Sequence, residues 1–233
     1  MYGPVLIAPS ILSADFLRFG EEVESIRSCG ADWVHVDVMD GHFVPNLSMG
    51  APLVAQLCAN RRLPIDVHLM VSNPLEQLDW YLESAPDSLT VHWEALDEAD
   101  RVGQAGEASK RIRATGALAA VSVKPDTPVS VLEPTLKLWD MVLVMSVYPG
   151  FSGQSFIEST PQRIAELVGL CEQAGVSPLI QVDGGMNPET AELVASAGAD
   201  CLVAGNAFFK ASDRAGVVAT IRQRCQAAQE ARW

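Results

Sequence analysis

The chain has 233 residues, of which 48% are apolar, and its formal net charge is −13 at pH 7. This length is enough for one large domain or two small ones with a sizeable core. The negative charge argues against nucleic acid or an anionic membrane surface as the main partner.

Short runs rich in β-branched residues recur along the chain and predict eight strands. In chain order they are residues 5–10, 33–39, 65–71, 89–95, 118–124, 140–147, 179–185 and 201–205. The clearest helical segments between or after them are 19–29, 74–84, 99–114, 157–174, 187–197 and 216–231. Several helices end at or near Gly or Pro just before the next strand, as helix C-caps do. Strict alternation of strands and helices predicts a parallel sheet covered by helices.

No Pro/Ser-rich linker or block of charge divides the chain, so residues 1–233 are expected to form a single domain. Eight β/α units in about 230–250 residues match a (β/α)8 TIM barrel. The competing fold, a doubly wound open sheet, usually has a G-x-G-x-x-G turn after an early strand, whereas the first strand here runs into APSILSADF. In a barrel, the chemistry lies at the C-terminal ends of the strands.

Four polar side chains are expected to converge at this end of the barrel. His35 and Asp37 share one face of the second strand because side chains alternate along a strand. His68 lies on the third strand and Asp183 ends the seventh. Packing could explain one inward histidine, but an unpaired buried carboxylate is costly. Two imidazoles and two carboxylates form a donor set for one divalent metal ion, Zn²⁺ first, with Fe²⁺, Mn²⁺ or Co²⁺ as alternatives.

Glycine-rich turns follow the last three strands and form a second candidate constellation. They are Gly150-Phe151-Ser152-Gly153, Gly184-Gly185 and Gly205-Asn206. Backbone N–H groups in such turns can bind a phosphate without Lys or Arg, and barrel enzymes commonly bind phosphate near the last two strands. Three methionines have the same inward parity as the polar residues on their strands: Met39, Met70 and Met145. We expect their flexible, polarisable side chains to line the bottom of a substrate site.

Six motifs in chain order resemble those of the ribulose-phosphate 3-epimerase family. They are IAPSILSADF (7–16), HVDVMDGHFVPN (35–46), DVHLMV (66–71), VMSVYPGFSGQSF (144–156), QVDGG (181–185) and VAGNAFF (203–209). The resemblance covers nearly the whole chain. It implies a ribulose-phosphate-binding barrel that inverts C3 of D-ribulose 5-phosphate to give D-xylulose 5-phosphate, a step of carbohydrate metabolism and of the pentose phosphate pathway.

The resemblance also assigns roles to residues. It implies four metal ligands: His35, Asp37, His68 and Asp183. Asp37 and Asp183 match the two catalytic acid/base carboxylates, and Ser10 and His68 match substrate contacts. The three glycine-rich turns match the phosphate-binding turns of the family.

Two positions depart from the family pattern. Ser152 stands in a turn that usually reads GFGGQ, and Asn206 stands in one that usually reads AGSA. Both are short polar side chains that can serve a phosphate. Glycine accepts a positive φ more easily than serine, so the backbone at Ser152 is a point to test.

Inversion of C3 suggests a two-carboxylate mechanism. The C3 proton is α to the C2 ketone, so its removal gives an enediolate. A proton must then reach the opposite face, which two carboxylates on well-separated strands can arrange. Asp37 and Asp183 meet that requirement.

Three alternatives stay open at this point. The first is a 3-epimerase of a ketohexose 6-phosphate such as D-allulose 6-phosphate. The second is a related barrel lyase or decarboxylase, which is disfavoured because no D-x-K-x-x-D pattern occurs at these strand ends. The third is a non-catalytic sugar-phosphate-binding barrel.

The remaining expectations concern the surroundings of the protein. The five cysteines are scattered, which fits a reducing compartment, and the first residues resemble neither a signal nor a transit peptide. No apolar run approaches the roughly 20 residues of a membrane helix. We expect a cytoplasmic homo-oligomer, a dimer or a hexamer, with a small sugar phosphate as its partner and neither nucleic acid nor a membrane.

Overall fold

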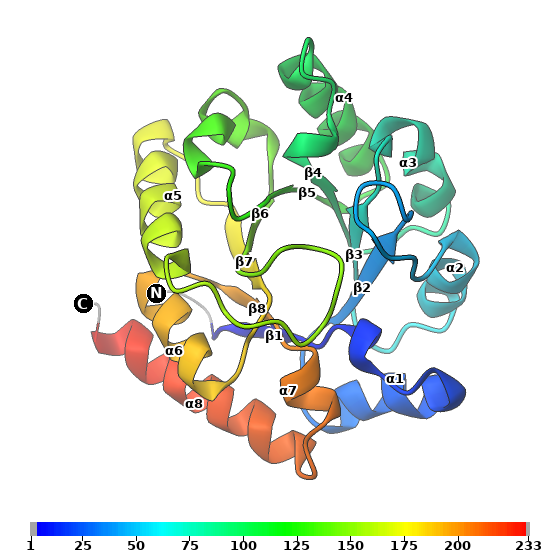
Figure 1. The fold of residues 1–233 in the computed structure, drawn as a ribbon, viewed down its shortest axis with the longest axis vertical. Coiled ribbons are helices and arrows are strands. Elements are labelled where there is room, and N and C mark those ends of the chain that lie inside the picture. The colour runs from blue at the N-terminus through cyan, green and yellow to red at the C-terminus, as the bar shows by residue number, and fades with distance from the viewer. Residues whose placement is uncertain (1–3, 232–233) are drawn as a thin grey trace.

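Eight parallel strands form a ring within residues 4–231, the part of the chain that this computed structural model describes (Figure 1). In chain order they are β1 (Leu6–Ala8), β2 (Val34–Met39), β3 (Ile65–Met70), β4 (Ser88–His92), β5 (Leu118–Val123), β6 (Met141–Met145), β7 (Leu179–Asp183) and β8 (Cys201–Val203). Seven of the predicted strand segments contain one of them. The fourth, 89–95, only overlaps β4, which begins one residue earlier at Ser88 and ends at His92, so the prediction of a strand over residues 93–95 was wrong. The predicted (β/α)8 barrel is nevertheless confirmed.

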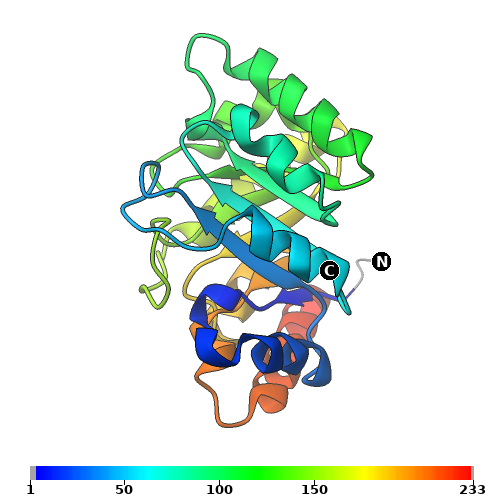
Figure 2. The same ribbon diagram turned by 90° about the vertical axis from the view of Figure 1, so that its right-hand side faces the viewer.

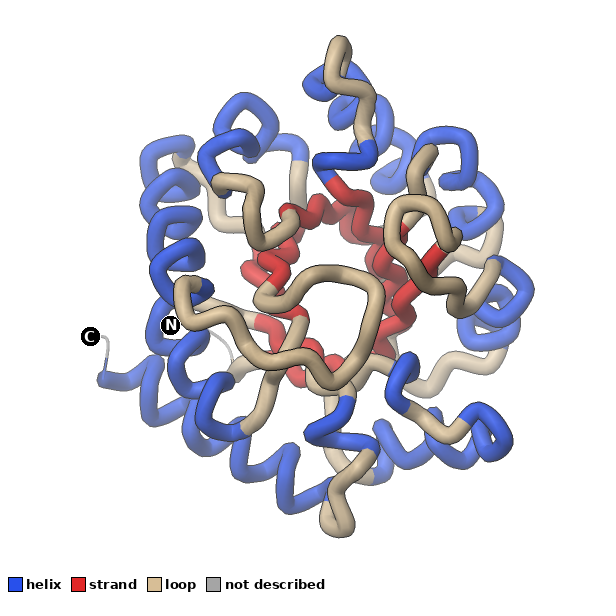
Figure 3. Tube along the Cα trace, in the orientation of Figure 1, coloured by secondary structure: helices blue, strands red, loops and turns tan. Residues whose placement is uncertain are grey.

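Hydrogen bonding between neighbouring strands runs in one continuous order from β1 through β8 and β7 back to β2. The ring closes between β1 and β2 just beyond the end of β1. Ser10 and His35 form a parallel bridge there, and the backbone N–H of His35 donates to the carbonyl of Pro9 at 3.1 Å. The strands appear as a closed red ring in Figure 3.

Helices surround this ring. The α-helices are α1 (Phe19–Ser28), α2 (Ala51–Ala59), α3 (Pro74–Leu82), α4 (Arg101–Ala114), α5 (Thr160–Ala174), α6 (Pro188–Ala197), α7 (Asn206–Phe209) and α8 (Arg214–Ala231). The 3₁₀ helices are η1 (Ile11–Ser13), η2 (Phe16–Arg18), η3 (Trp93–Ala95) and the longer η4 (Val129–Leu138). The segment between β5 and β6 is thus a 3₁₀ helix with Pro134 inside it, and proline cannot donate an α-helical hydrogen bond.

Local sequence explains where these helices begin and end. The side chain of Asn187 accepts from the backbone of Thr190, and the Thr190 hydroxyl accepts from the backbone of Asn187. This reciprocal capping box starts α6 directly after β7. Gly175 ends α5 in the left-handed region with φ of 66°, where glycine has no steric penalty.

Alternation along β2 separates two environments. Val34, Val36 and Val38 are buried in the large apolar core between the ring and the helices. The residues between them face the inside of the ring, where His35 is the register partner of Asp66, and Asp37 is the register partner of His68. The same register brings polar side chains of β2 and β3 to the same depth of the barrel.

The loops that follow the strands lie at one end of the barrel (Figure 2). The loop between β6 and α5 is the most prominent of them and lies across the mouth of the ring in Figures 1 and 3. Its base is held by a hydrogen bond of 2.9 Å from the N–H of Ile157 to the carbonyl of Ser146. This loop carries the Gly150–Gly153 turn, so the fold brings that turn over the predicted site.

None of the helices in residues 4–231 is long and apolar enough to span a membrane. The organisation of residues 1–233 as one catalytic domain stays a prediction. Residues 1–3 and 232–233 lie outside the described part of the chain.

Candidate active site

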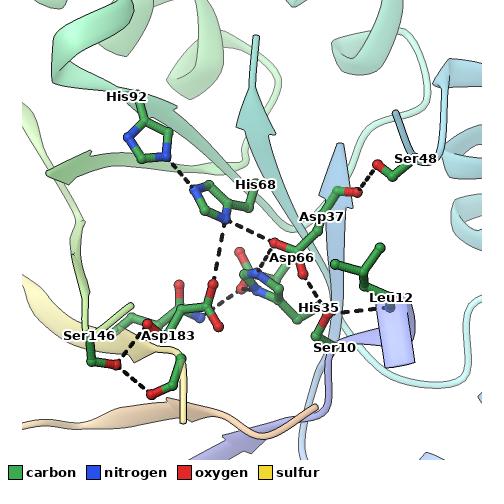
Figure 4. Close-up of polar contacts among 12 residues, drawn as sticks. Ser10, Leu12, His35, Asp37, Ser48, Asp66, His68, His92, Ser146 and Asp183 are labelled. Atoms are coloured by element: carbon green, nitrogen blue, oxygen red, sulfur yellow. Dashed lines mark hydrogen bonds and ion pairs between the residues drawn. The ribbon is translucent and has the colours of Figure 1, made fainter. Parts of the chain in front are cut away.

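Four predicted residues come together at the mouth of the barrel: His35, Asp37, His68 and Asp183. Each offers one donor atom, and these atoms all lie within 4.8 Å of one another. Figure 4 shows His68 between the two carboxylates, with its Nδ1 atom 3.1 Å from Asp37 Oδ1 and 4.0 Å from Asp183 Oδ2. The Nε2 atom of His35 is 3.3 Å from the same Asp37 oxygen.

This geometry fits a divalent cation. Ligand atoms about 2.0–2.2 Å from a tetrahedral Zn²⁺ lie roughly 3.3–3.6 Å from one another. The separations of Asp37 Oδ1 from the two histidine nitrogens, 3.1 Å and 3.3 Å, are close to this range, and Asp183 Oδ2 lies farther out, at 4.0 Å from His68 Nδ1. His35, Asp37 and His68 are almost fully buried, and a buried carboxylate needs a positive partner. Two nitrogen and two oxygen donors suit zinc and also the other ions expected from the sequence.

A second layer below the four residues orients His35. The Nδ1 atom of His35 lies 2.7 Å from Oδ2 of Asp66, which also accepts a hydrogen bond of 2.7 Å from the Gln181 amide. A carboxylate at this position favours a proton on Nδ1, so the Nε2 atom of His35 faces the cluster. Burial alone would lower the pKa of His35, but Asp37 and Asp66 hold that pKa well above its usual value.

The two carboxylates of the site have opposite proton affinities. Burial alone would raise the pKa of Asp37, but His35 and His68 outweigh it and hold that pKa well below its usual value. Asp183 has no histidine nitrogen as close to it as Asp37 has, and its burial together with the charge of Asp37 raises its pKa to about 7. At neutral pH one carboxylate is therefore ionised and the other is close to half protonated, which is the asymmetry that acid and base roles require.

His68 also belongs to a row of buried and partly buried groups that leads away from the mouth. Its Nε2 atom lies 2.9 Å from Nε2 of His92, and Nδ1 of His92 lies 3.2 Å from Oε2 of Glu94. Burial lowers the pKa of His92 to about 4, although Glu94 opposes this shift. Burial would raise the pKa of Glu94. His92, the hydroxyl of Thr127 and the backbone N–H of Lys124 outweigh burial and lower that pKa to about 2.

A cavity of about 370 Å³ opens above the cluster. Many of the predicted site residues line it: Ser10, Asp37, Met39, Met70, Met145, Gly150, Phe151, Ser152, Gly153, Asp183, Gly184, Gly185, Gly205 and Asn206. His35 and His68 do not line it, because both rings are fully buried below its floor. A direct contact of His68 with substrate therefore stays a prediction.

Among the glycines of the turns at one end of this cavity, Gly184 has no room for a side chain. A Cβ atom on Gly184 would lie 2.4 Å from a methyl group of Val147, and its φ is +116°. Ser146 supports the same turn, with its hydroxyl 2.7 Å from the carbonyl oxygen of Asp183 and 2.6 Å from that of Gly184. Ser152 does not adopt a positive φ, so serine is accommodated there without backbone strain.

Sequence reasoning missed several polar groups of the site. Ser13 lines the cavity, and its hydroxyl oxygen, like Oδ1 of Asn206, is buried without a hydrogen-bond partner in the described chain. Asp66 was not assigned a role in the site, although it has the inward parity of its strand. Alternation alone could have found it, whereas Glu94 follows its strand and carries no such periodicity. His92 also has the inward parity of its strand, and it contacts His68 without lining the cavity.

The sequence model described as the ribulose-phosphate 3-epimerase family matches residues 6–209. The chain is 46% identical over 229 residues to a ribulose-phosphate 3-epimerase of Mycobacterium tuberculosis, covering 97% of this chain and 95% of that protein. It is 47% identical over 207 residues to one from Rhodobacter capsulatus, covering 88% and 86%. The crystal structure of KGPDC from Streptococcus mutans superposes with a TM-score of 0.71 at 13% identity, over 97% of this chain and 99% of that one, which shows the barrel fold alone.

Proposed function

The chain belongs to the ribulose-phosphate 3-epimerase family, and on that basis we propose that it inverts C3 of D-ribulose 5-phosphate to give D-xylulose 5-phosphate. The observation that carries the proposal is the pair Asp37 and Asp183. Both face one cavity, and their pKa values are shifted in opposite directions. A reaction that removes a proton on one face and delivers one on the other needs such a pair.

In the proposed reaction, the ionised carboxylate removes the C3 proton, which is acidic because it is α to the C2 ketone. The resulting enediolate is planar at C3. The other carboxyl group then donates its proton from the opposite face, and the two groups exchange roles in the reverse direction. Ser10 orients Asp37 for this role. Its hydroxyl donates to Oδ2 of Asp37 at 2.5 Å, and the other oxygen, Oδ1, faces His35 and His68.

His35, Asp37, His68 and Asp183 would hold the metal ion, for which Zn²⁺ is the first candidate. When bound, a divalent cation supplies a Lewis acid for the negative charge that develops on the C2 oxygen. Met39, Met70 and Met145 line the cavity beside these residues and give it an apolar surface next to the carboxylates.

We place the phosphate of the substrate at the turns Gly150–Gly153, Gly184–Gly185 and Gly205–Asn206. Among residues 4–231, no Lys or Arg lines this cavity, so backbone N–H groups and short polar side chains would have to bind the anion. The unpartnered hydroxyl of Ser13 can donate a hydrogen bond to the phosphate. Asn206 can donate only through its side-chain NH₂, because its unpartnered Oδ1 atom is an acceptor. Remote binding of the phosphate would position C3 between the carboxylates.

A coupled assay that detects D-xylulose 5-phosphate, together with metal analysis of the same sample, tests this function. We expect turnover of D-ribulose 5-phosphate, and a higher kcat/KM for it than for D-allulose 6-phosphate. A preference for the hexulose phosphate would transfer the proposal to the alternative substrate. Absence of turnover with both substrates in metal-loaded protein would contradict the epimerase assignment.

The homo-oligomeric state and the cytoplasmic location expected from the sequence stay predictions. Sedimentation velocity of the purified protein would distinguish a dimer from a hexamer.

A further inference from the structure

We propose that Glu94 is a positioning residue that acts through His92 to keep the proton of His68 on Nε2, so that Nδ1 is free to bind the metal ion. The groups concerned form one row, Asp37–His68–His92–Glu94, with a carboxylate at each end (Figure 4 shows all but Glu94). The proposal deepens the proposed function and rests on the metal role given there to Asp37 and His68.

The row contains three gaps between facing polar atoms. They measure 3.1 Å between Asp37 and His68, 2.9 Å between the two histidines and 3.2 Å between His92 and Glu94. Two neutral imidazoles carry only two ring protons, so hydrogen bonds can fill only two of the three gaps. The direction in which the two histidines donate their N–H groups decides which gap is left without a hydrogen bond. A cation can fill only the gap beside Asp37.

Glu94 sets that direction. Its Oε1 atom accepts from the backbone N–H of Lys124 at 2.7 Å and from the hydroxyl of Thr127 at 2.5 Å. Its Oε2 atom faces Nδ1 of His92 and can only accept. His92 must therefore carry its proton on Nδ1 to make this bond, which leaves its Nε2 atom as an acceptor for His68.

His68 then completes the sequence of bonds. Its Nε2 atom donates to Nε2 of His92, and its Nδ1 atom keeps a lone pair facing Asp37 and Asp183. The His92 ring is fully buried and packs 4.8 Å, centroid to centroid, from the ring of Phe43. Within the described chain, the ring nitrogens of His92 contact only His68 and Glu94. No solvent reaches the ring to offer another partner.

The same geometry explains why His68 and His35 differ. His35 receives its orientation directly from a carboxylate, Asp66, at 2.7 Å. His68 faces another histidine, which is both a donor and an acceptor and imposes no direction of its own. A fixed acceptor at the far end of the row is therefore required, and Glu94 is that acceptor.

Glu94→Gln is the decisive variant, because it should reverse the direction of the hydrogen bonds through His92 and His68 while the side chain keeps nearly the same shape. The N–H of Lys124 still needs an acceptor, so the amide oxygen of the new side chain should remain there. The amide NH₂ would then face Nδ1 of His92, which must accept. His92 would carry its proton on Nε2, and His68 would be driven to carry its proton on Nδ1, the metal-binding atom.

Two measurements test the proposal without substrate. Zn²⁺ affinity by chelator competition should weaken by about 10–100-fold in Glu94→Gln, as for other residues that orient metal-binding histidines. Long-range ¹H–¹⁵N spectra of ¹⁵N-histidine protein should show protons on Nδ1 of His92 and Nε2 of His68 in the zinc-loaded protein. In metal-free Glu94→Gln the two protons should lie on Nε2 of His92 and Nδ1 of His68.

Glu98→Gln is the matched control, because Glu98 is exposed and the charge change is the same. It should leave both measurements unchanged. Equal zinc affinity of Glu94→Gln and the unmodified protein would overturn the proposal, and so would a proton on Nε2 of His92 in the zinc-loaded unmodified protein. The latter measurement decides the matter even if the variant fails to fold.

The outcomes separate this proposal from the function on which it rests. Failure of the unmodified protein to bind Zn²⁺ at the four residues would remove the proposed metal site itself. Tight binding that is unaffected by Glu94→Gln would leave that site in place and remove only the role of Glu94.

Discussion

Asp37 on β2 and His68 on β3 are register partners, and Oδ1 of the carboxylate lies 3.1 Å from Nδ1 of the imidazole. The pairing of the parallel strands thus sets two of the proposed metal ligands side by side. Asp183 reaches the same point from β7, on the far side of the ring, with an oxygen 4.0 Å from the same nitrogen. Each of the following predictions depends on this arrangement or on the turn that leads away from it.

Replacing either carboxylate should stop epimerisation. We expect Asp37→Asn and Asp183→Asn each to lower kcat by at least about 10²–10⁴-fold, because an amide can neither take up nor deliver the C3 proton. Circular dichroism and zinc content should be measured alongside kcat, since both residues also face the metal site. Asp100→Asn, at an exposed aspartate, is the control and should keep full activity. Substantial turnover in both site variants would rule out the two-carboxylate mechanism.

The origin of the new C3 hydrogen can be followed with heavy water. If one carboxylate takes the substrate proton and the other delivers its own, xylulose 5-phosphate formed in D₂O should carry deuterium at C3. Mass spectrometry or proton NMR of the product measures this directly. Substrate kept in D₂O without protein gives the background exchange. Product free of solvent label would instead indicate a hydride route.

Metal affinity should depend steeply on pH near neutrality. The pKa of Asp183 is raised to about 7 by burial and by Asp37, so below that pH the metal must displace a proton from this carboxyl group. We expect the Kd for Zn²⁺ to rise by at least about tenfold for each pH unit below about 7. In Asp183→Asn, the slope should fall by about one proton, whereas an affinity that is flat with pH would contradict the assignment.

Asp40 should stabilise the loop that follows β2. It accepts hydrogen bonds of 2.8 Å from the backbone N–H groups of His42, Phe43 and Ser72, and one of the same length from the Ser72 hydroxyl. Although burial raises the pKa of Asp40, these bonds outweigh it and lower that pKa to about 2. Asp40→Asn should therefore lower the free energy of unfolding by about 1–3 kcal/mol at neutral pH.

The sign of the pH dependence provides the check on Asp40. Because its pKa is lower in the folded than in the unfolded chain, the stabilisation is present above an unfolded value of about 4 and is lost as pH falls toward 2. Urea unfolding of both proteins from about pH 7 to pH 3 should show the difference between them shrinking. A difference that stays constant over this range would show that the Asp40 charge does not contribute.

Sequence periodicity predicted much of this arrangement. Alternation placed His35 and Asp37 inward and the neighbouring valines outward, and the structure has them so. Strand order then brought Asp183 to the same end of the barrel. These predictions succeed because the direction of a strand side chain depends on parity alone.

Other features depend on contacts between distant segments. Alternation gives Asp66 an inward position but not its 2.7 Å approach to His35, which depends on the register between β2 and β3. Glu94 lies in η3, beyond its strand, and its direction is set by the turn at Lys124 and Thr127. The raised pKa of Asp183 likewise depends on burial by the assembled barrel.

The position of the donors along the chain has a kinetic consequence for folding. His35, Asp37 and His68 come from consecutive strands, whereas Asp183 follows only after β4, β5 and β6. Pairings between segments far apart in the chain form late, because loop-closure entropy must first be overcome. A metal ion present during refolding would therefore meet three donors early and the fourth only when β7 is in place. The increase in its affinity with time would report the moment at which the ring closes.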